Sequence, residues 1–510
     1  MRKNKTCEIS IMSFLNQSSS QLPMEEVVPL AAAVQGLTRS SILTARRRVR
    51  IAPQTGVNYG TATASSTSGP GGAGNNQIQF LIADQGGLVD PSSVSVVYNI
   101  RTSGTGSEIP QDGHPFTRLQ CTLNGSMLDD IQQAAKLTNV EARLGGSQTW
   151  YRTSGSFQGF EMLNNELNNG NLTSVAPTTA TVTAYSGAWA DVSNNLAAIS
   201  GRSTSSAGST TYNPLQGEQR AIPLGLLTGV GRMKQYLPLS VLGELTLTLF
   251  TGDKSTVVFQ NGATADGDYS LSGVFLEYDV VVGHPSYMEL LAKVANDPAD
   301  QGIVLPFEST IASSSGTIAA SSSALVENSI VVSRATNHLL RAMLVQQPTA
   351  LFATNNYPIQ ACFPHCGTYS VQWRVGSMYY PQVPAIGDAS LWMMTQLAYG
   401  STNQEAASCI NREQWRQTTA VTAGTAGATA TEGSAKFCYA DSFIPAYGFQ
   451  TVKGDAEPLM VDGISLSGAS GSQLVCVVQN SPSITVTPTV FLVALRFIQC
   501  SGGAVKIMGA

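Results

Sequence analysis

The chain has 510 residues, a net charge of −5 and a charged fraction of only 12%, about half that of an average soluble domain. Its 48 glycines accompany many serines, threonines, asparagines and alanines, a composition that suits a β-protein packing against copies of itself better than a freely diffusing enzyme. No stretch approaches the roughly 18 consecutive apolar residues of a membrane span, and the N-terminal stretch lacks the apolar core of a signal peptide. We therefore expect a soluble chain that is made inside the cell.

Residues 1–76 are predicted to form a flexible basic N-terminal arm. The first 50 residues carry eight lysines and arginines against three glutamates, and four of the arginines lie together as Arg46, Arg47, Arg48 and Arg50. Such a run favours contact with nucleic acid, an anionic lipid surface or an acidic protein. A solvated run ahead of the first strand is the alternative, and charge alone does not separate the two interpretations.

A first β-domain is predicted over residues 77–283. Short stretches at 78–82, 94–100 and 119–123 alternate apolar and polar residues with a period of two, as strands with one buried face do. Helical spacing over Leu128–Leu144 predicts a helix that ends at two glycines. The composition then changes, and residues 145–220 are predicted to be a long loop insertion.

The most regular alternation lies in Tyr236–Phe250. Leu245, Leu247 and Leu249 alternate with threonines, which predicts a half-buried strand. Pro238 at the head of this segment favours an outer or first position, because proline cannot donate to a central ladder.

A second β-domain is predicted over residues 301–510, with a loop insertion at 416–441. Residues 284–300 are predicted to be a connecting helix, because Pro285 suits a first helical turn and Pro298 follows its end. The last strand of each half contains the sequence Val-Phe-Leu, at 274–276 and 490–492. The chain therefore predicts an all-β fold of two tandem sandwiches with short helices and long surface loops.

No pattern in the sequence predicts a catalytic residue, a cofactor or a metal site. Cys362 and Cys366 flank His365, but zinc wants four ligands and a second pair at suitable spacing is not evident, so a disulfide or two buried thiols is the better interpretation. The sequence has no Gly-x-Ser-x-Gly or His-Glu-x-x-His motif. Its eight cysteines form no dense framework, which favours a reducing compartment. We expect the chain not to be an enzyme.

Several stretches occur in an order that is typical of one protein family: Ile78–Asp84, Phe116–Leu123 with Leu128–Gln132, Tyr236–Leu239 with its leucine strand, Ile330–Ala335, and Gly376–Pro384 followed by a helix. This order, over residues 77–505, resembles the double jelly-roll major capsid proteins of polinton-like viruses and virophages. Related tailless icosahedral double-stranded DNA viruses share the resemblance more distantly. The ordered set carries the likeness, since no single stretch is specific by itself.

The resemblance implies two tandem eight-stranded jelly rolls and a structural role. It implies a homotrimer of pseudo-hexagonal outline that contacts neighbouring capsomers and minor capsid or penton proteins in an icosahedral shell. The chain would then belong to the virion and be made in the interior of the host cell. The loop insertions at 145–220 and 416–441 would form outward towers. The arm, with Arg46, Arg47, Arg48 and Arg50, would face inward and contact an internal membrane, a protein or viral DNA.

The residues alone leave one other function open and disfavour a third. In a carbohydrate-binding or adhesin-like β-sandwich protein, Trp150, Tyr151, Trp189 and Trp392 would stack on sugars. A jelly-roll enzyme of the cupin kind would need clustered histidines, and the histidines of this chain are dispersed.

Overall fold

The structure of the chain is a computed structural model. It describes residues 43–60, 76–103, 107–108, 114–147, 150, 154–160, 218–253, 257, 259–260, 268–296, 302–321, 324–332, 334–349, 363–399, 410, 415–416, 436–443, 464–466, 473–483 and 485–509. Most of the predicted insertion 145–220, most of 416–441, and Cys362 lie outside these residues.

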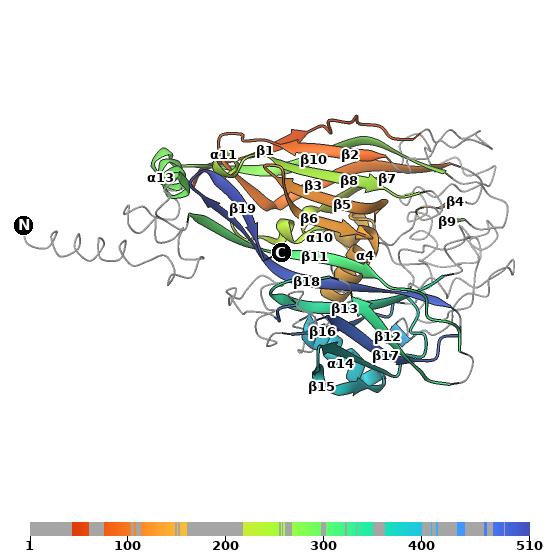
Figure 1. Cartoon of the computed structure of the whole chain (residues 1–510). Helices are drawn as coiled ribbons and strands as arrows, with labels where there is room; N and C mark the ends of the chain where they lie inside the picture. Colours follow the sequence, from red (N-terminus) through yellow and green to blue (C-terminus); the bar gives the residue numbers. More distant parts are fainter. Residues whose placement is uncertain are drawn as a thin grey trace, which may run out of the picture.

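The first half of the chain forms two four-stranded antiparallel sheets (Figure 1). One sheet has the order β1-β10-β3-β7, and the other has the order β2-β8-β5-β6. The strands are β1 (Leu43–Ile51), β2 (Gln77–Ile82), β3 (Leu88–Ser103), β5 (Phe116–Leu123), β6 (Ser126–Gln132), β7 (Glu218–Pro223), β8 (Leu245–Thr251) and β10 (Asp268–Gly283). Two short strands, β4 (Ser107–Glu108) and β9 (Phe259–Gln260), pair separately.

The second half forms two further antiparallel sheets of the same kind. Their orders are β11-β18-β13-β16 and β12-β17-β14-β15, and β19 (Ala504–Met508) adds to β18. The strands are β11 (Ile303–Ser314), β12 (Val326–Val332), β13 (Leu339–Pro348), β14 (Ser370–Val375), β15 (Met378–Ile386), β16 (Tyr439–Ser442), β17 (Leu474–Asn480) and β18 (Val486–Ser501).

The two halves have the same topology. If the eight strands of the large sheets are counted in chain order within each half, one sheet runs first, eighth, third, sixth. The other runs second, seventh, fourth, fifth. Two facing antiparallel sheets built this way from eight strands are a jelly roll. The chain is a double jelly roll, as predicted, and we call residues from β1 to β10 roll 1 and those from β11 to β19 roll 2.

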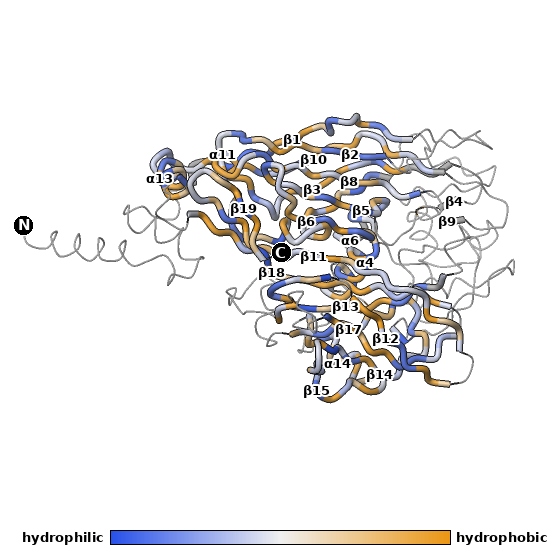
Figure 2. The backbone as a smooth tube through the Cα atoms, in the orientation of Figure 1, coloured by the Kyte–Doolittle hydropathy of each residue, from blue (hydrophilic) through white to orange (hydrophobic). Residues whose placement is uncertain are grey.

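Apolar residues fill the space between the sheets of each roll, and the hydropathy alternates along many strands (Figure 2). The leucines of β8 are an example of this alternation. Leu245, Leu247 and Leu249 are buried to 1% exposure or less, which confirms the predicted strand phase. The predicted outer position is wrong, because β8 lies between β2 and β5. Pro238 precedes a short helix, α11 (Leu239–Leu242), and so does not interrupt the ladder.

The predicted helix over Leu128–Leu144 begins later than the spacing suggested. Residues Ser126–Gln132 form β6, and the helix α4 covers Ala134–Gly145. Gln133, between the two elements, has a φ of 63° and turns the chain from strand to helix. The range predicted for the connecting helix contains α13 (Pro285–Asn296). A third long helix, α14 (Gly387–Ala398), follows β15 directly.

Three short helical turns complete the described part of roll 1. They are α6 (Ser154–Phe157), α10 (Leu224–Leu227) and the 3-10 turn η3 (Gly229–Arg232). The turns α10 and η3 lie beside α4 and β11, respectively, so they belong to the junction between the two rolls.

The structure differs from the predicted arm at Leu43–Ile51. This segment is β1, which pairs with β10 along its length and is the first strand of roll 1. The predicted boundary at residue 77 would leave roll 1 with seven of its eight strands. A run of arginines gives no strand signal, because the period of two is visible only when the opposite face is apolar.

Candidate functional site: charged contacts within the rolls and the exposed ends

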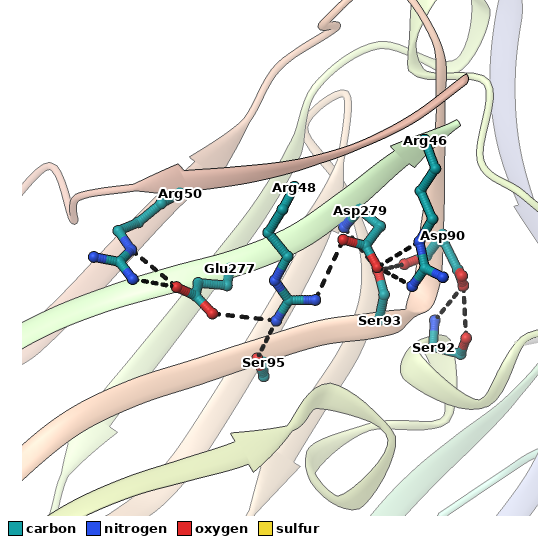
Figure 3. A network of polar contacts seen from close by, with 9 residues as sticks. All are labelled: Arg46, Arg48, Arg50, Asp90, Ser92, Ser93, Ser95, Glu277 and Asp279. Atoms are coloured by element: carbon teal, nitrogen blue, oxygen red, sulfur yellow. Dashed lines mark hydrogen bonds and ion pairs between the residues drawn. The ribbon is translucent and has the colours of Figure 1, made fainter. Parts of the chain in front are cut away.

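The four predicted arginines lie on an edge strand and point to both of its faces. Arg46, Arg48 and Arg50 alternate along β1 and share one face, whereas Arg47 lies on the other. The register places Arg48 opposite Asp279 and Arg50 opposite Glu277 on β10. Figure 3 shows the three arginines reaching these two carboxylates across the neighbouring strand.

We call Arg46, Arg48, Arg50, Glu277 and Asp279 the arginine ladder. The Arg46 Nε lies 2.9 Å from Asp279 Oδ2. Arg48 bridges both carboxylates, at 3.2 Å from Glu277 and 3.3 Å from Asp279. The Arg50 Nε donates to Glu277 at 2.9 Å, and its guanidinium stacks 4.2 Å above the centre of the Phe275 ring. The carboxylates are far less exposed than the arginines, with 4% for the Asp279 side chain against 66% for that of Arg46.

Charge pairing within the ladder lowers the pKa of Glu277 and raises the pKa of Arg46. Burial raises the pKa of Glu277, but hydrogen bonds from Arg50 and Arg48 outweigh it and leave that pKa below its ordinary value. The hydrogen bond to Asp279 raises the pKa of Arg46. Arg47 donates instead to the carbonyl oxygen of Gln85. Within the described part of the chain, these hydrogen-bond partners of the four arginines therefore belong to roll 1 itself, and contact with lipid, protein or genome stays a prediction.

A second group of charged residues joins roll 1 to roll 2. Asp129 on β6 accepts hydrogen bonds from Thr228 Oγ1 at 2.7 Å, from Ser309 Oγ at 2.9 Å and from the Thr310 backbone nitrogen at 3.3 Å. Ser309 and Thr310 lie on β11 of roll 2. Burial raises the pKa of Asp129 to about 6, although these three hydrogen bonds oppose the shift.

Helix α4 carries a buried ion network across the same junction. Glu141 contacts Arg232 of η3 at 2.8 Å and Arg341 of β13 at 2.9 Å. Arg232 also lies 3.2 Å from Glu308 of β11, and the Arg341 side chain is fully buried. Because buried charges are tolerated only when paired, this network requires the two rolls to hold one relative position.

The backbone approaches most closely at Gly229. A Cβ atom added there would lie 1.9 Å from the carbonyl oxygen of Glu308 on β11. Only glycine permits this approach. Residues 134–144 of α4 are all buried, and this helix packs against β5 and α10 of roll 1.

The free end of roll 2 exposes apolar side chains, which the sequence analysis did not identify. The group consists of Tyr369, Met378, Tyr379, Val383, Ile386 and Met393, with exposures from 41% for Tyr379 to 75% for Val383. They lie on β15, on α14 and beside the start of β14. We call this the β15–α14 face. The sequence signal was the low polarity of Met378–Ile386, which contains no charged residue.

The cysteine and histidine cluster is packed as part of a core. His365 contacts the rings of Trp415 and Phe437 at centroid distances of 5.3 and 4.7 Å, and burial lowers its pKa to about 4. Cys366 is buried. Among the described residues, no group of three or more His, Cys, Asp or Glu side chains could hold a metal ion. Nor does any helix in the described ranges have the length and apolarity to cross a membrane.

The aromatic residues proposed for sugar stacking contact other rings where they are described. Trp392 packs against Trp415 at 5.4 Å, and Trp150 packs against Phe160 at 5.6 Å between centroids. Tyr151 and Trp189 lie outside the described residues. The structure therefore brings no pair of these four side chains together as a platform in the part of the chain that it describes.

Comparison with known proteins found similarity only among solved structures. No family model matches the sequence, and no curated protein matches it. The structure is similar to PBCV-1 VP54 fitted into a reconstruction of the virophage Sputnik, with 10% identity, a TM-score of 0.49, and coverage of 92% of this chain and 97% of that one. The Sputnik virophage structure gives 14% identity, a TM-score of 0.49 and coverage of 92% and 89%. The Faustovirus major capsid protein has 10% sequence identity to this chain and a TM-score of 0.49. The match covers 94% of this chain and 97% of that one.

These structures come from the group of viruses that the sequence resemblance named. The chain spans nearly the whole length of each. At such low identity the likeness concerns the fold, and the fold here rests on the strand order of the two rolls.

Proposed function

We propose that the chain is a viral major capsid protein that self-assembles as pseudo-hexagonal trimers into an icosahedral shell. The observation that carries the proposal is the repetition of one roll topology in a single chain, with the two rolls fixed side by side through buried charges. A chain that holds two equivalent rolls in a fixed position is a building unit, and three such chains can form a ring of six rolls.

The composition supports the same role. With only 12% charged residues, the surface has few charges that close packing between subunits would bury unpaired. The partners in this proposal are two further copies in a homotrimer, neighbouring capsomers, and minor capsid or penton proteins. The location is the capsid shell of the virion, after synthesis in the interior of the host cell. The role is structural and not enzymatic.

The basic N-terminal region is proposed to face the interior and to contact an internal membrane, a protein or viral DNA. The support is the excess of lysine and arginine in the first 50 residues. Arg46, Arg48 and Arg50 share their charge with Glu277 and Asp279, which leaves less of it for an external anion.

Electron microscopy of the purified full-length chain tests the proposed function. Capsomers of pseudo-hexagonal outline, or closed shells, are the expected images. Dispersed single copies at every protein and salt concentration would contradict a capsid role.

A further inference from the structure

A pocket opens at the junction between the two rolls, and both rolls form its wall. Figure 1 shows β6 of roll 1 and β11 of roll 2 side by side at this junction. The pocket lies where these two strands end and has a volume of about 330 Å³. We call it the junction pocket, and its wall consists of Gln132, Gln133, Ala312, Ser313, Ser314, Val331 and Arg334. A molecule bound there would contact both rolls.

The wall of the junction pocket carries a positive charge and no negative one. Arg334 is its charged residue, and none of the other six residues is acidic. Arg334 is exposed and forms no ion pair with any other residue that the structure describes. The acidic residue that precedes the pocket on β6, Asp130, is paired with Arg118 at 2.6 Å. An arginine without a carboxylate partner beside a polar pocket favours an anionic ligand.

Hydrogen bonds behind the wall fix the direction of its polar groups. The Lys136 ammonium, which can only donate, lies 2.8 Å from Gln133 Oε1. Thr489 Oγ1 donates to the same oxygen at 3.3 Å. The Gln133 amide nitrogen therefore points the other way and donates to Ser314 Oγ. Because Ser314 Oγ accepts this bond, its own O–H group is available to donate to a ligand in the pocket.

Lys136 places a second positive charge behind the wall. It is only 8% exposed, and burial lowers its pKa to about 8. The ammonium is therefore still the main form at neutral pH, although the loss of hydration makes it less favourable than in water. A negative charge in the pocket would stabilise this ammonium, because Coulomb attraction is stronger in a partly buried environment than in water.

We propose that the junction pocket binds an inorganic phosphate or diphosphate anion, held by Arg334 and Ser314 of roll 2 and by Gln132 of roll 1. A guanidinium donates two parallel hydrogen bonds to a phosphate group, and the hydroxyl and amide groups of the wall supply further donors. The volume is many times the roughly 30 Å³ that a water molecule occupies in the liquid, so an anion of several heavy atoms fits. The bound anion links the two rolls of one chain.

Titration calorimetry of the full-length chain with phosphate, and separately with diphosphate, tests the proposal in chloride buffer of matched ionic strength. We expect one site per chain. Arg334→Gln should weaken binding at least tenfold, because it removes the charged, two-bond contact. Gln132→Ala should weaken binding by a smaller factor, because it removes a neutral donor. Arg374→Gln is the matched control, since Arg374 shares a sheet face with Val331 through Val475 but does not line the pocket, and it should bind normally.

Thermal unfolding of the same variants provides a second measurement. Arg334 and Gln132 are exposed, so their substitution should leave the unfolding temperature in chloride unchanged. Added diphosphate should raise the unfolding temperature of the unaltered chain and of Arg374→Gln, because a ligand of the folded state stabilises it. The increase should be smaller in Arg334→Gln. Stabilisation of the kind that excluded salts give acts on all variants alike, so the difference between variants reports the site.

Three results would overturn the proposal. The first is an unaltered chain that binds neither phosphate nor diphosphate at millimolar concentration. The second is binding of equal strength in Arg334→Gln, which would place the anion elsewhere. The third is binding that depends on Arg334 but is unchanged in Gln132→Ala, which would overturn the link between the rolls. The pocket lies within one chain, so each result leaves the proposed assembly of copies to be tested by microscopy.

Discussion

At the scale of single residues, Asp129 shows how the junction between the rolls depends on pH. Its pKa is raised from 3.8 to about 6, so the folded chain holds this proton more tightly than the unfolded chain. The contribution of Asp129 to stability is therefore greatest below its unfolded pKa. It decreases as the pH rises through the range from about 4 to about 6, by roughly 3 kcal/mol in total.

Asp129→Asn should remove this pH dependence. The three groups that contact Asp129 are all donors, and an amide oxygen still accepts from Ser309 and Thr310 while Thr228 rotates its hydroxyl. We expect the difference in unfolding free energy between variant and unaltered chain to increase in favour of the variant from pH 4 to pH 7. Urea unfolding at both pH values measures it. A difference in unfolding free energy that is the same at both pH values would show that Asp129 is not buried as described.

Glu277 should give the opposite dependence, because its pKa is lowered. A lowered carboxyl pKa contributes stability that is present above the unfolded value of 4.5 and is lost as the pH falls through the folded value. Glu277→Gln should therefore flatten the loss of stability below pH 4.5, and added salt should have a smaller effect on the variant. Thermal unfolding from pH 3 to pH 6 measures this. An equal loss of stability below pH 4.5 in the variant and in the unaltered chain would contradict pairing in the ladder.

Gly229→Ala should weaken the junction directly. The added Cβ would overlap the carbonyl oxygen of Glu308, and the strain of such overpacking is typically about 1–3 kcal/mol. Gly145→Ala is the matched control, because its added Cβ would have no neighbour within 4 Å. Chemical unfolding compares the two. Equal stability of both variants would mean that the rolls do not approach at Gly229.

At the scale of elements, the sequence determined the phase of the strands better than their position. The alternation of leucines with threonines predicted which face of β8 is buried, because burial acts on each residue locally. The central position of β8 depends on pairing with β2 and β5, which the local pattern does not contain. The start of α4 was predicted too early for a related reason. Leu128 and Ile131 fit helical spacing, but they lie on strand β6 and are buried there.

The candidate site was predictable only in part, for the same physical reason. Charge revealed Arg46, Arg48 and Arg50, but their partners lie 227 to 233 positions away. No local pattern links residues so distant. The exposure of Val383 and Met393 was equally hidden, because an apolar side chain in a strand or helix normally predicts a core.

The position of β1 predicts two different results of N-terminal truncation. Removing residues 1–42 leaves roll 1 complete, so the unfolding temperature should match that of the full chain. Removing residues 1–51 deletes the edge strand, exposes the hydrogen-bonding edge of β10 and removes the contacts of Val49 and Ile51 with the core.

The longer truncation should therefore unfold at lower temperature and aggregate, as calorimetry and turbidity would show. Identical behaviour of the two truncations would mean that β1 is not part of the roll.

At the scale of the whole molecule, the chain is one roll topology used twice. The Val-Phe-Leu sequence occurs in the eighth strand of each roll, on β10 and on β18, which supports the equivalence of the two. The two ends of the molecule differ in chemistry nonetheless: β1 carries four arginines, and β15 contains no charged residue.

The mass of the full-length chain in solution, measured by light scattering during size-exclusion chromatography, tests this account most directly. A capsid protein of the proposed kind should give a discrete species of three times the chain mass. A monodisperse single chain at all concentrations would contradict it.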